Sequence, residues 1–288
     1  MSEYESVEVT IENKIAHIKL NKPDTYNTFT PALWVEIPKA VKKISDGALA
    51  RVIVLSSTGK HFCAGMDLSV FTSGVSEGEF ELARKHENLR RLVFQLQDCF
   101  NALEESRIPV LVASQGGCIG AGLDMICAAD SRYCTKDAFF SIEETKLGMT
   151  ADVGTLQRLP KIIPQGIVRE LAYTGRRFMA DEAKDAGLVN KVFDTQEEML
   201  DHVMSIASQI AANSPLAVTG CKTMINYTRD HSVSDSLAYM ATWQAGMYQP
   251  QNDMFETFAA KAEKRAPQFD EIPPVVELET LFNSSKES

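Results

Sequence analysis

The chain has 288 residues, of which 44% are hydrophobic and 24% charged, and its formal net charge is -10. That length can bury a sizeable core, as one large domain or two smaller ones. The acidic balance and the lack of a Lys/Arg-dense block argue against a nucleic-acid-binding protein, because such proteins need a basic face.

The ends of the chain and its cysteines bear on where the protein works. Residues 1–5 lack the basic and apolar stretches of a secretory signal, and their acids are untypical of a mitochondrial transit peptide. Residues 286–288 differ from the Ser-Lys-Leu peroxisomal signal. No apolar run is long enough to span a membrane. The six cysteines include no CxxC pair, which favours buried free thiols in a reducing compartment. We therefore expect a soluble intracellular protein with no clear targeting signal.

The first 60 residues alternate strand patterns with one helix. Residues 7–11 and 15–20 show alternating apolar positions around Asn13, which predicts a β-hairpin. Thr30 before Pro31 is typical of a helix start, and apolar residues then recur at helical spacing. The continuous apolar run within residues 51–56 predicts a buried strand.

The next segment contains two glycine-containing loops, each after a buried strand. The first loop covers residues 58–68, and residues 69–79 follow as a polar loop. Residues 81–103 have the pattern of a long amphipathic helix. Residues 109–113 form a second apolar strand pattern, which runs into the glycines of residues 116–122.

Strands and helices continue to alternate up to about residue 195, which predicts an α/β layered core. A short helix is expected over residues 123–129 and a strand over residues 132–135. Only helical patterns follow, over residues 197–212, 215–227, 234–245 and 253–264.

This change of pattern predicts three parts. Residues 1–195 form a core that carries the active site, residues 196–268 a helical C-terminal region, and residues 269–288 a tail. The tail contains Pro273-Pro274 and many polar residues, so it is expected to be loose or docked.

The two glycine loops have the composition of an anion-binding backbone site. A strand that ends in a glycine turn before a helix leaves first-turn N–H groups free at the positive end of the helix dipole. N–H groups from the two loops together would form an oxyanion hole. Two ordinary tight turns are the alternative interpretation for either loop alone.

Three carboxylates lie in or beside these glycine-rich, apolar segments. Asp124 lies early in the helix after the second loop, Glu144 follows the next strand, and Asp152 comes shortly before Gly154. Acids in an apolar cleft have raised pKa values and exchange protons near neutral pH. Asp152 could instead cap a helix that starts near Val153, and Glu144 could belong to a solvated loop.

Other catalytic chemistries find no support in the sequence. No GxSxG nucleophile motif and no Walker A loop occur, and Met125 stands where a dinucleotide-binding motif needs its third glycine. The histidines lack metal-ligand spacing; His61, next to the first glycine loop, is interpreted as a surface or structural residue. We expect neither a metal nor a separate cofactor.

Three segments together resemble the crotonase (enoyl-CoA hydratase/isomerase) superfamily. They read HFCAGMDL at residues 61–68, GCIGAGLD at residues 117–124 and GTLQRLP at residues 154–160, within a match over residues 7–265. The resemblance implies a spiral core of repeated ββα turns, a helical trimerisation region and trimers that pair into hexamers. It also implies that an acyl-CoA thioester is the substrate, so that coenzyme A enters as part of the substrate.

The resemblance assigns the binding groups. Its two oxyanion-hole N–H groups fall on Met66 and Ala121, the latter being often glycine in the family. Contacts with coenzyme A fall on Ala64, Asp67 and Leu68. Basic residues near the last helix end could meet the phosphates of coenzyme A, or could simply form a solvated helix face: Lys261, Lys264 and Arg265.

The same resemblance assigns the three acids. The two glutamates of the hydratases match Asp124 and Glu144, and the shortening of the first weakens the hydratase interpretation. Typical hydratases carry glycine at the position of Asp152. The set Asp, Glu, Asp is similar to that of the 3,5-2,4-dienoyl-CoA isomerases.

These isomerases move a proton from C2 to C6 of the acyl chain through a dienolate held by the oxyanion hole. The resemblance implies that Glu144 is the base at C2, that Asp152 is the acid at C6 and that Asp124 tunes Glu144. Enoyl-CoA hydration and 3,2-enoyl-CoA isomerisation remain alternatives, as does a non-catalytic scaffold that binds acyl-CoA. The family works in mitochondria or peroxisomes, in the β-oxidation of unsaturated fatty acids.

Overall fold

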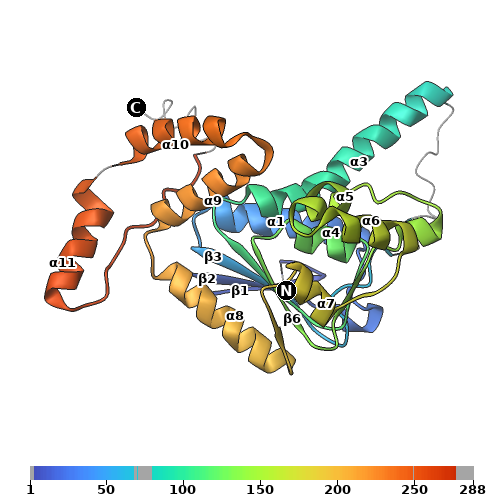
Figure 1. Cartoon of the computed structure of the whole chain (residues 1–288), viewed down its shortest axis with the longest axis horizontal. Helices are drawn as coiled ribbons and strands as arrows, with labels where there is room; N and C mark the ends of the chain where they lie inside the picture. The colour runs from blue at the N-terminus through green and yellow to red at the C-terminus, as the bar shows by residue number, and fades with distance from the viewer. Residues whose placement is uncertain (1–2, 68–69, 71–79, 249, 277–288) are drawn as a thin grey trace.

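A six-stranded sheet runs through the middle of the protein in the computed structural model, which describes residues 3–67, 70, 80–248 and 250–276 (Figure 1). Strands β1 and β2 form the predicted antiparallel hairpin, and the later neighbours pair parallel. In spatial order the strands are β1 (Val7–Glu12), β2 (Ile15–Leu20), β3 (Val52–Ser57), β4 (Val110–Ser114), β6 (Ser131–Thr135) and β9 (Lys191–Phe193).

Helices cover both faces of this sheet (Figure 1). Helix α1 (Pro31–Asp46) and the C-terminal part of α3 (Leu82–Glu105) share one apolar core with the sheet. Helix α8 (Gln196–Ala211) packs on the opposite face. Thr30 caps α1 as predicted, because its side chain accepts a hydrogen bond from the Leu33 amide.

The apolar run in β3 follows from this double cover. Ile53 and Leu55 face the core shared with α1, whereas Val52 and Val54 face α8, and all four are 0% exposed. Successive side chains of a strand point to opposite faces, so a strand covered on both faces must be apolar at every position.

A second, three-stranded sheet consists of β5 (Gly117–Ile119), β7 (Phe139–Ser141) and β8 (Phe178–Met179). The chain repeatedly makes a strand of the large sheet, then a short strand of the small sheet, then helices. Strands β4 and β5 with helix α4 (Ala121–Cys127) form one such turn. These turns build the predicted crotonase-type spiral of ββα units. Strand β5 was predicted only as a glycine turn, because three residues that include a glycine give no strand pattern.

The remaining helices differ in detail from the prediction. Helix α4 begins two residues earlier than expected, and the last predicted helix is split into η4 and α11. The elements are η1 (Pro23–Thr25), η2 (Glu144–Leu147), α5 (Thr155–Arg158), η3 (Leu159–Lys161), α6 (Gln165–Thr174), α7 (Ala180–Ala186), α9 (Pro215–Asp230), α10 (Val233–Met247), η4 (Pro250–Met254) and α11 (Phe255–Glu263).

Helix α9 is fixed to the core by a buried lysine, while α10 and α11 extend away from the sheets (Figure 1). Lys222 Nζ donates hydrogen bonds to Asp130 Oδ2 at 2.8 Å and to the carbonyls of Leu103 and Ile108. Apolar side chains of the outer helices are left exposed, including Leu237 at 64%.

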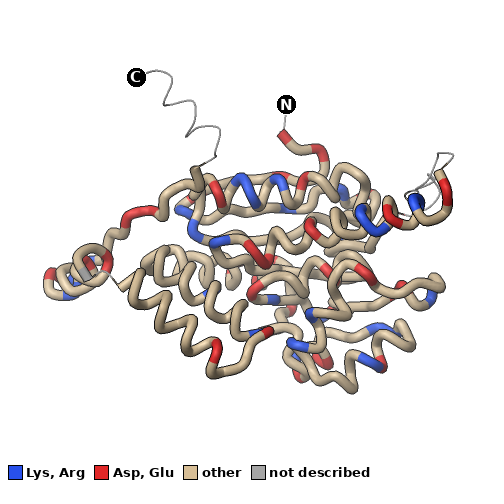
Figure 2. Tube along the Cα trace, turned by 90° about the horizontal axis from the view of Figure 1, so that it is seen from above, with Lys and Arg blue, Asp and Glu red and all other residues tan. Residues whose placement is uncertain are grey.

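Charged residues of both signs and free cysteines are scattered over the described part of the chain. Figure 2 shows acidic and basic residues interspersed along the trace. No helix within the described residues is long and apolar enough to cross a membrane. The prediction of buried free thiols is wrong for one residue, because Cys221 on α9 is exposed; the buried ones are Cys63, Cys99, Cys118, Cys127 and Cys134.

Candidate active site

The structure brings the two predicted glycine loops into contact. The Cys63 amide donates to the Gly117 carbonyl at 3.1 Å, and the Ile119 amide donates to the Cys63 carbonyl at 3.0 Å. Gly65 has φ +93°, and a Cβ there would lie 3.1 Å from the carbonyl oxygen of Ile119. Glycine at residue 65 therefore serves both the backbone turn and the close approach of the loops.

The two amides expected to form an oxyanion hole are left unused by the backbone. Phe29 pairs with the residues on either side of Met66: its amide donates to Gly65 and its carbonyl accepts from Asp67. Met66 N–H therefore points away from Phe29. Ala121 is the first residue of α4, where an N–H has no intrahelical acceptor. Within the described part of the chain, neither amide makes a backbone hydrogen bond.

Asp124 is 0% exposed and lies in the first turn of α4. Its Oδ1 accepts a hydrogen bond from the Thr155 amide at 2.5 Å, and its Oδ2 is buried without a partner among the described residues. Thr155 is the first residue of α5, so Asp124 already satisfies the amide at that helix start. The alternative in which Asp152 caps this helix is wrong, because the N-cap of α5 is Gly154 and no side chain makes a capping hydrogen bond there.

Glu144 points its carboxyl group at the second glycine loop. A Cβ at Gly120 would lie 3.2 Å from Glu144 Oε1 and 3.9 Å from the Gly65 Cα. Glu144 Oε2 is buried without a hydrogen-bond partner in the described chain. The alternative of a solvated loop describes the neighbouring residues Glu143 and Lys146, which form an ion pair with each other, and not Glu144.

Asp152 lies between η2 and α5, with an exposed side chain. Its main-chain carbonyl accepts a hydrogen bond from Gln97 Nε2 of α3 at 2.7 Å. Its carboxyl group is close enough to Glu144 for the charge of Asp152 to raise the pKa of Glu144.

The three carboxyl groups hold protons more tightly than ordinary acids. Burial raises the pKa of Asp124 to about 7 against the hydrogen bond from Thr155, and the charges of Glu144 and Asp152 add to the rise. Burial also raises the pKa of Glu144, with the charge of Asp152 adding to it. Partial desolvation raises the pKa of Asp152 although the side chain is exposed in the single chain. All three acids are therefore harder to ionise than solvated carboxyl groups.

His61, predicted to be a surface or structural residue, links the two glycine loops. The Gly117 amide donates to His61 Nδ1 at 2.9 Å, so the imidazole adds one more bond between the two glycine loops. Burial lowers the pKa of His61, which keeps Nδ1 free to accept that bond. The position of His61 beside the first loop was the only sequence signal of this contact.

The residues expected to contact coenzyme A are only partly assembled. Ala64 and Asp67 lie in the first glycine loop, where the Ala64 amide donates to the Tyr26 carbonyl. Leu68 lies outside the described residues. Lys264 is the C-cap of α11, and this helix lies far from α4 and α5 within one chain (Figure 1).

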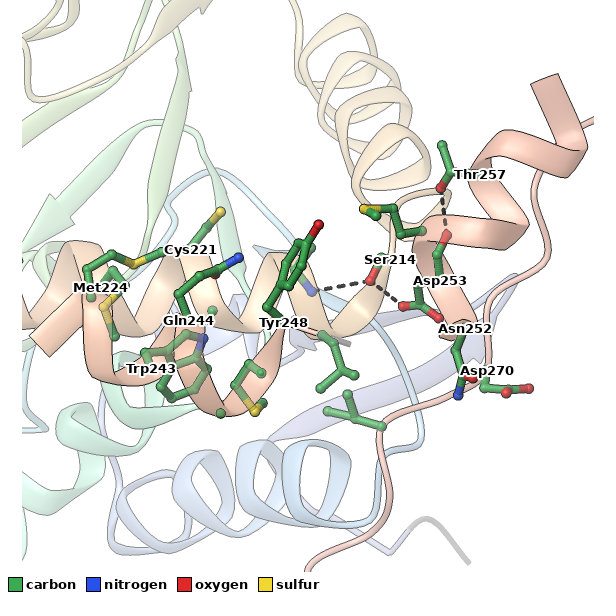
Figure 3. A pocket seen from close by; sticks show the side chains of 18 of the residues that line it. Ser214, Cys221, Met224, Trp243, Gln244, Tyr248, Asn252, Asp253, Thr257 and Asp270 are labelled. Carbon is green, nitrogen blue, oxygen red and sulfur yellow. Dashed lines mark hydrogen bonds between the residues drawn. The ribbon is translucent and has the colours of Figure 1, made fainter. Parts of the chain in front are cut away.

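A wide groove lies in the C-terminal helical region rather than beside the acids. It has a volume of about 860 Å³ and is formed by α9, α10, η4 and the segment around Ile272. Figure 3 shows Met224, Trp243 and Tyr248 around it, with Ser214 bonded to Asp253 at one end. Of the acids that line it, Asp253 accepts a hydrogen bond from Ser214 and Glu271 is paired with Arg51. The acids at the glycine loops instead have buried oxygens without a partner among the described residues, so they remain the candidate site.

Among the residues that the structure describes, no cluster of three His, Cys, Asp or Glu side chains has the geometry to hold a metal ion.

Comparisons with known proteins agree with this architecture. The family model described as "Enoyl-CoA hydratase/isomerase" matches residues 10–272. The chain is 44% identical over 265 residues to the mitochondrial Delta(3,5)-Delta(2,4)-dienoyl-CoA isomerase of Mus musculus, covering 91% of this chain and 81% of that protein. It is 41% identical over 277 residues to the peroxisomal protein of that name from Arabidopsis thaliana, covering 94% and 99%.

A solved structure extends the comparison to the fold. The enoyl-CoA hydratase from Bacillus anthracis superposes with a TM-score of 0.82 at 30% identity, covering 92% of this chain and 99% of that one. The family match spans both glycine loops and all three carboxylates. The chain belongs to the enoyl-CoA hydratase/isomerase family.

Proposed function

We propose that the protein isomerises 3,5-dienoyl-CoA to 2,4-dienoyl-CoA by moving a proton from C2 to C6. The observation that carries this proposal is the third acid: Asp152 is electrostatically coupled to Glu144, whose carboxyl group lies against the glycine loops. The names of the mouse and Arabidopsis relatives support the same substrate.

In this mechanism the thioester oxygen accepts hydrogen bonds from the Met66 and Ala121 amides. Negative charge develops on that oxygen when C2 loses its proton, and preorganised N–H donors stabilise it at the positive end of α4. Removal of one such donor from the oxyanion hole of a protease raises the barrier by about 3–4 kcal/mol.

The proton transfers balance between two carboxyl groups. Glu144, as carboxylate, takes the proton from C2, and the freed electron pair spreads over the thioester oxygen and the carbon chain. Asp152, as carboxylic acid, gives its proton to C6 and is left ionised. The double bonds then stand at C2 and C4, and proton exchange with solvent restores both acids.

The coupling of the acids suits this division of roles. A negative charge on one carboxylate raises the pKa of its neighbour, so a set of close acids retains protons at neutral pH. Protonation of Asp152 removes its charge from Glu144 and leaves Glu144 easier to ionise. Asp124 adds a third carboxyl group, and its pKa of about 7 means that its charge changes near neutral pH.

Enoyl-CoA hydration or 3,2-enoyl-CoA isomerisation is the second candidate. It is supported by the likeness to the Bacillus anthracis hydratase. Both reactions use the same oxyanion hole but have no need of an acid at C6.

The test is turnover of a synthetic 3,5-dienoyl-CoA, followed by the ultraviolet absorbance of the conjugated product. We expect Asp152→Asn to lower kcat by about 10²–10⁴-fold with little change in KM, because a general acid contributes on that scale. Asp185→Asn is the matched control, since this exposed acid on α7 lies outside the site. Full dienoyl turnover by Asp152→Asn, or turnover of 2-enoyl-CoA alone by the parent, would favour the second candidate.

We propose further that the protein forms homotrimers or hexamers through its C-terminal helices. Val233 and Leu237 of α10 and Phe255 and Phe258 of α11 are 55–72% exposed, which is unfavourable for a free monomer. Assembly would also bring Lys264 toward coenzyme A bound by a neighbour. Light scattering with Leu237→Glu, expected to shift the mass toward monomer, tests the assembly.

The names of the relatives also support a proposal for the cellular location of this protein. The mouse relative is named mitochondrial and the Arabidopsis relative peroxisomal. We therefore propose that this protein works in one of these two organelles, which microscopy of a tagged full chain would decide between.

A further inference from the structure

Helix α3 carries a polar stripe that faces the segment containing Asp152. Gln97, Asn101 and Glu104 stand at i, i+4 and i+7 of the helix and so share one face. All three make hydrogen bonds to residues 152–158. The rest of α3 is amphipathic, so this stripe is an addition to ordinary core packing.

The two ends of the segment are held separately. At its start, Gln97 Nε2 donates to the main-chain carbonyl of Asp152 at 2.7 Å. At its end, Arg158 donates to Asn101 Oδ1 at 2.6 Å and to Glu104 Oε2 at 2.8 Å. The Arg158 side chain is only 11% exposed, so these charge-assisted bonds are well shielded from water.

The middle of the segment is equally constrained. Gly154 has φ +136°, and a Cβ there would lie 2.0 Å from Arg158 Nη1, so the guanidinium folds directly over the glycine. The Thr155 amide is bonded to Asp124. The backbone around Asp152 is thus fixed from α3 and α4, while its carboxyl group stays unengaged by either helix.

We propose that Gln97 is a positioning residue for Asp152, and this inference rests on the proposed function. Its bond reaches the main chain rather than the carboxyl group, so it fixes where the acid stands without neutralising it. A general acid must come within hydrogen-bond reach of the atom it protonates. Misplacement of a reacting group by about 1 Å can lower a rate by about 10²-fold.

The position of Asp152 controls one step only. Glu144 and the oxyanion loops form the dienolate, whereas Asp152 decides whether that intermediate is protonated at C6 or returns to substrate by protonation at C2. A displaced Asp152 therefore slows product formation and leaves more intermediate to return. A general loss of structure would slow both outcomes together.

The experiment uses Gln97→Met, which keeps the length of the side chain and removes the donor. Its matched control is Gln95→Met, since Gln95 is an exposed glutamine on the same helix and makes no side-chain hydrogen bond within the described chain. The full-length variants turn over 3,5-dienoyl-CoA in D2O. Product is followed by absorbance, and deuterium at C2 of recovered substrate by mass spectrometry.

We expect Gln97→Met to lower kcat by about 10–10²-fold with KM within about threefold of the parent, following the effect of misplaced reacting groups. Deuterium incorporated per product formed should rise at least about tenfold, since the intermediate returns more often. In an Asp152→Asn background the Gln97 substitution should add little, because both changes remove the same step.

Two results would overturn the inference while leaving the proposed function in place. One is a Gln97→Met enzyme with the kcat of the Gln95→Met control. The other is an equal loss of product formation and of C2 exchange, which indicates a merely structural role. Failure of the proposed function looks different, because the parent itself then forms no 2,4-dienoyl-CoA, and the inference falls with it.

Discussion

Replacement of Asp124 by asparagine tests how the fold tolerates a buried acid. Asp124 is fully buried, Thr155 is the hydrogen-bond partner of its Oδ1, and its Oδ2 has none among the described residues. Asparagine keeps the acceptor for Thr155 and removes the titrating group. The substitution should therefore change how stability depends on pH more than it changes the fold.

The size of this pH effect on stability follows from the pKa of Asp124 in the folded chain. Burial raises the pKa of Asp124 from 3.8 to about 7, so the folded chain holds this proton more tightly than the unfolded chain does. Stability is highest below the ordinary pKa, falls as the pH rises toward 7, and is level above it. Between about pH 5 and pH 8 this one carboxyl should lower the free energy of unfolding by about 2–3 kcal/mol.

The Asp124→Asn variant lacks that pH-dependent loss of stability. The amide group of asparagine is left without a partner where Oδ2 stood, which costs about 1–3 kcal/mol, but this penalty is the same at every pH. Only the difference between the two pH values is therefore compared. The other acids titrate in both proteins and cancel to first order.

The assay is urea unfolding of parent and Asp124→Asn at about pH 5 and pH 8, at one protein concentration. The parent should lose about 2–3 kcal/mol more than the variant over that range. Asp185→Asn, on the surface of α7, should follow the parent. Parallel pH profiles of parent and Asp124→Asn would refute the reasoning, since they would mean that Asp124 titrates like a solvated acid.

Three other substitutions test close contacts. Gly120→Ala should lower kcat by about 10²-fold in a folded protein, measured by dienoyl-CoA turnover, because φ is +50° and the new Cβ would crowd the neighbouring glutamate carboxyl. Gly154→Ala should destabilise the fold by about 2–4 kcal/mol in urea, because its Cβ would displace Arg158. Lys222→Met should cost about 1–3 kcal/mol because it leaves the buried carbonyls of Leu103 and Ile108 without the hydrogen bonds from Lys222 Nζ, and an unchanged urea midpoint would contradict this.

Local patterns in the sequence were sufficient for several of the regular elements. The hairpin of residues 7–20 and the cap at Thr30 depend on neighbours in the chain, so the alternation and the capping residue predicted them. Strand β5 was missed because its pairing with β7 lies outside its own three residues. The π-helical turn at η4 likewise carries no local signal that separates it from α11.

In the candidate site, too, some features could be predicted from the sequence and others could not. Asp124, Glu144 and Asp152 stand out in the sequence as acids among glycines and apolar residues, and the family resemblance assigns their roles. Their surroundings could not be read from the sequence. The bond from Thr155 to Asp124 and the bond from Gln97 to Asp152 join residues that are 31 and 55 positions apart.

The sequence by itself thus determined the residue types of the chemistry and the local elements that carry them. Only the tertiary structure decided which glycine loops touch, which acid is buried and which carbonyl Gln97 holds. The physical reason is that backbone turns and caps are set by near neighbours, whereas burial and the resulting pKa of an acid depend on atoms brought in from distant segments.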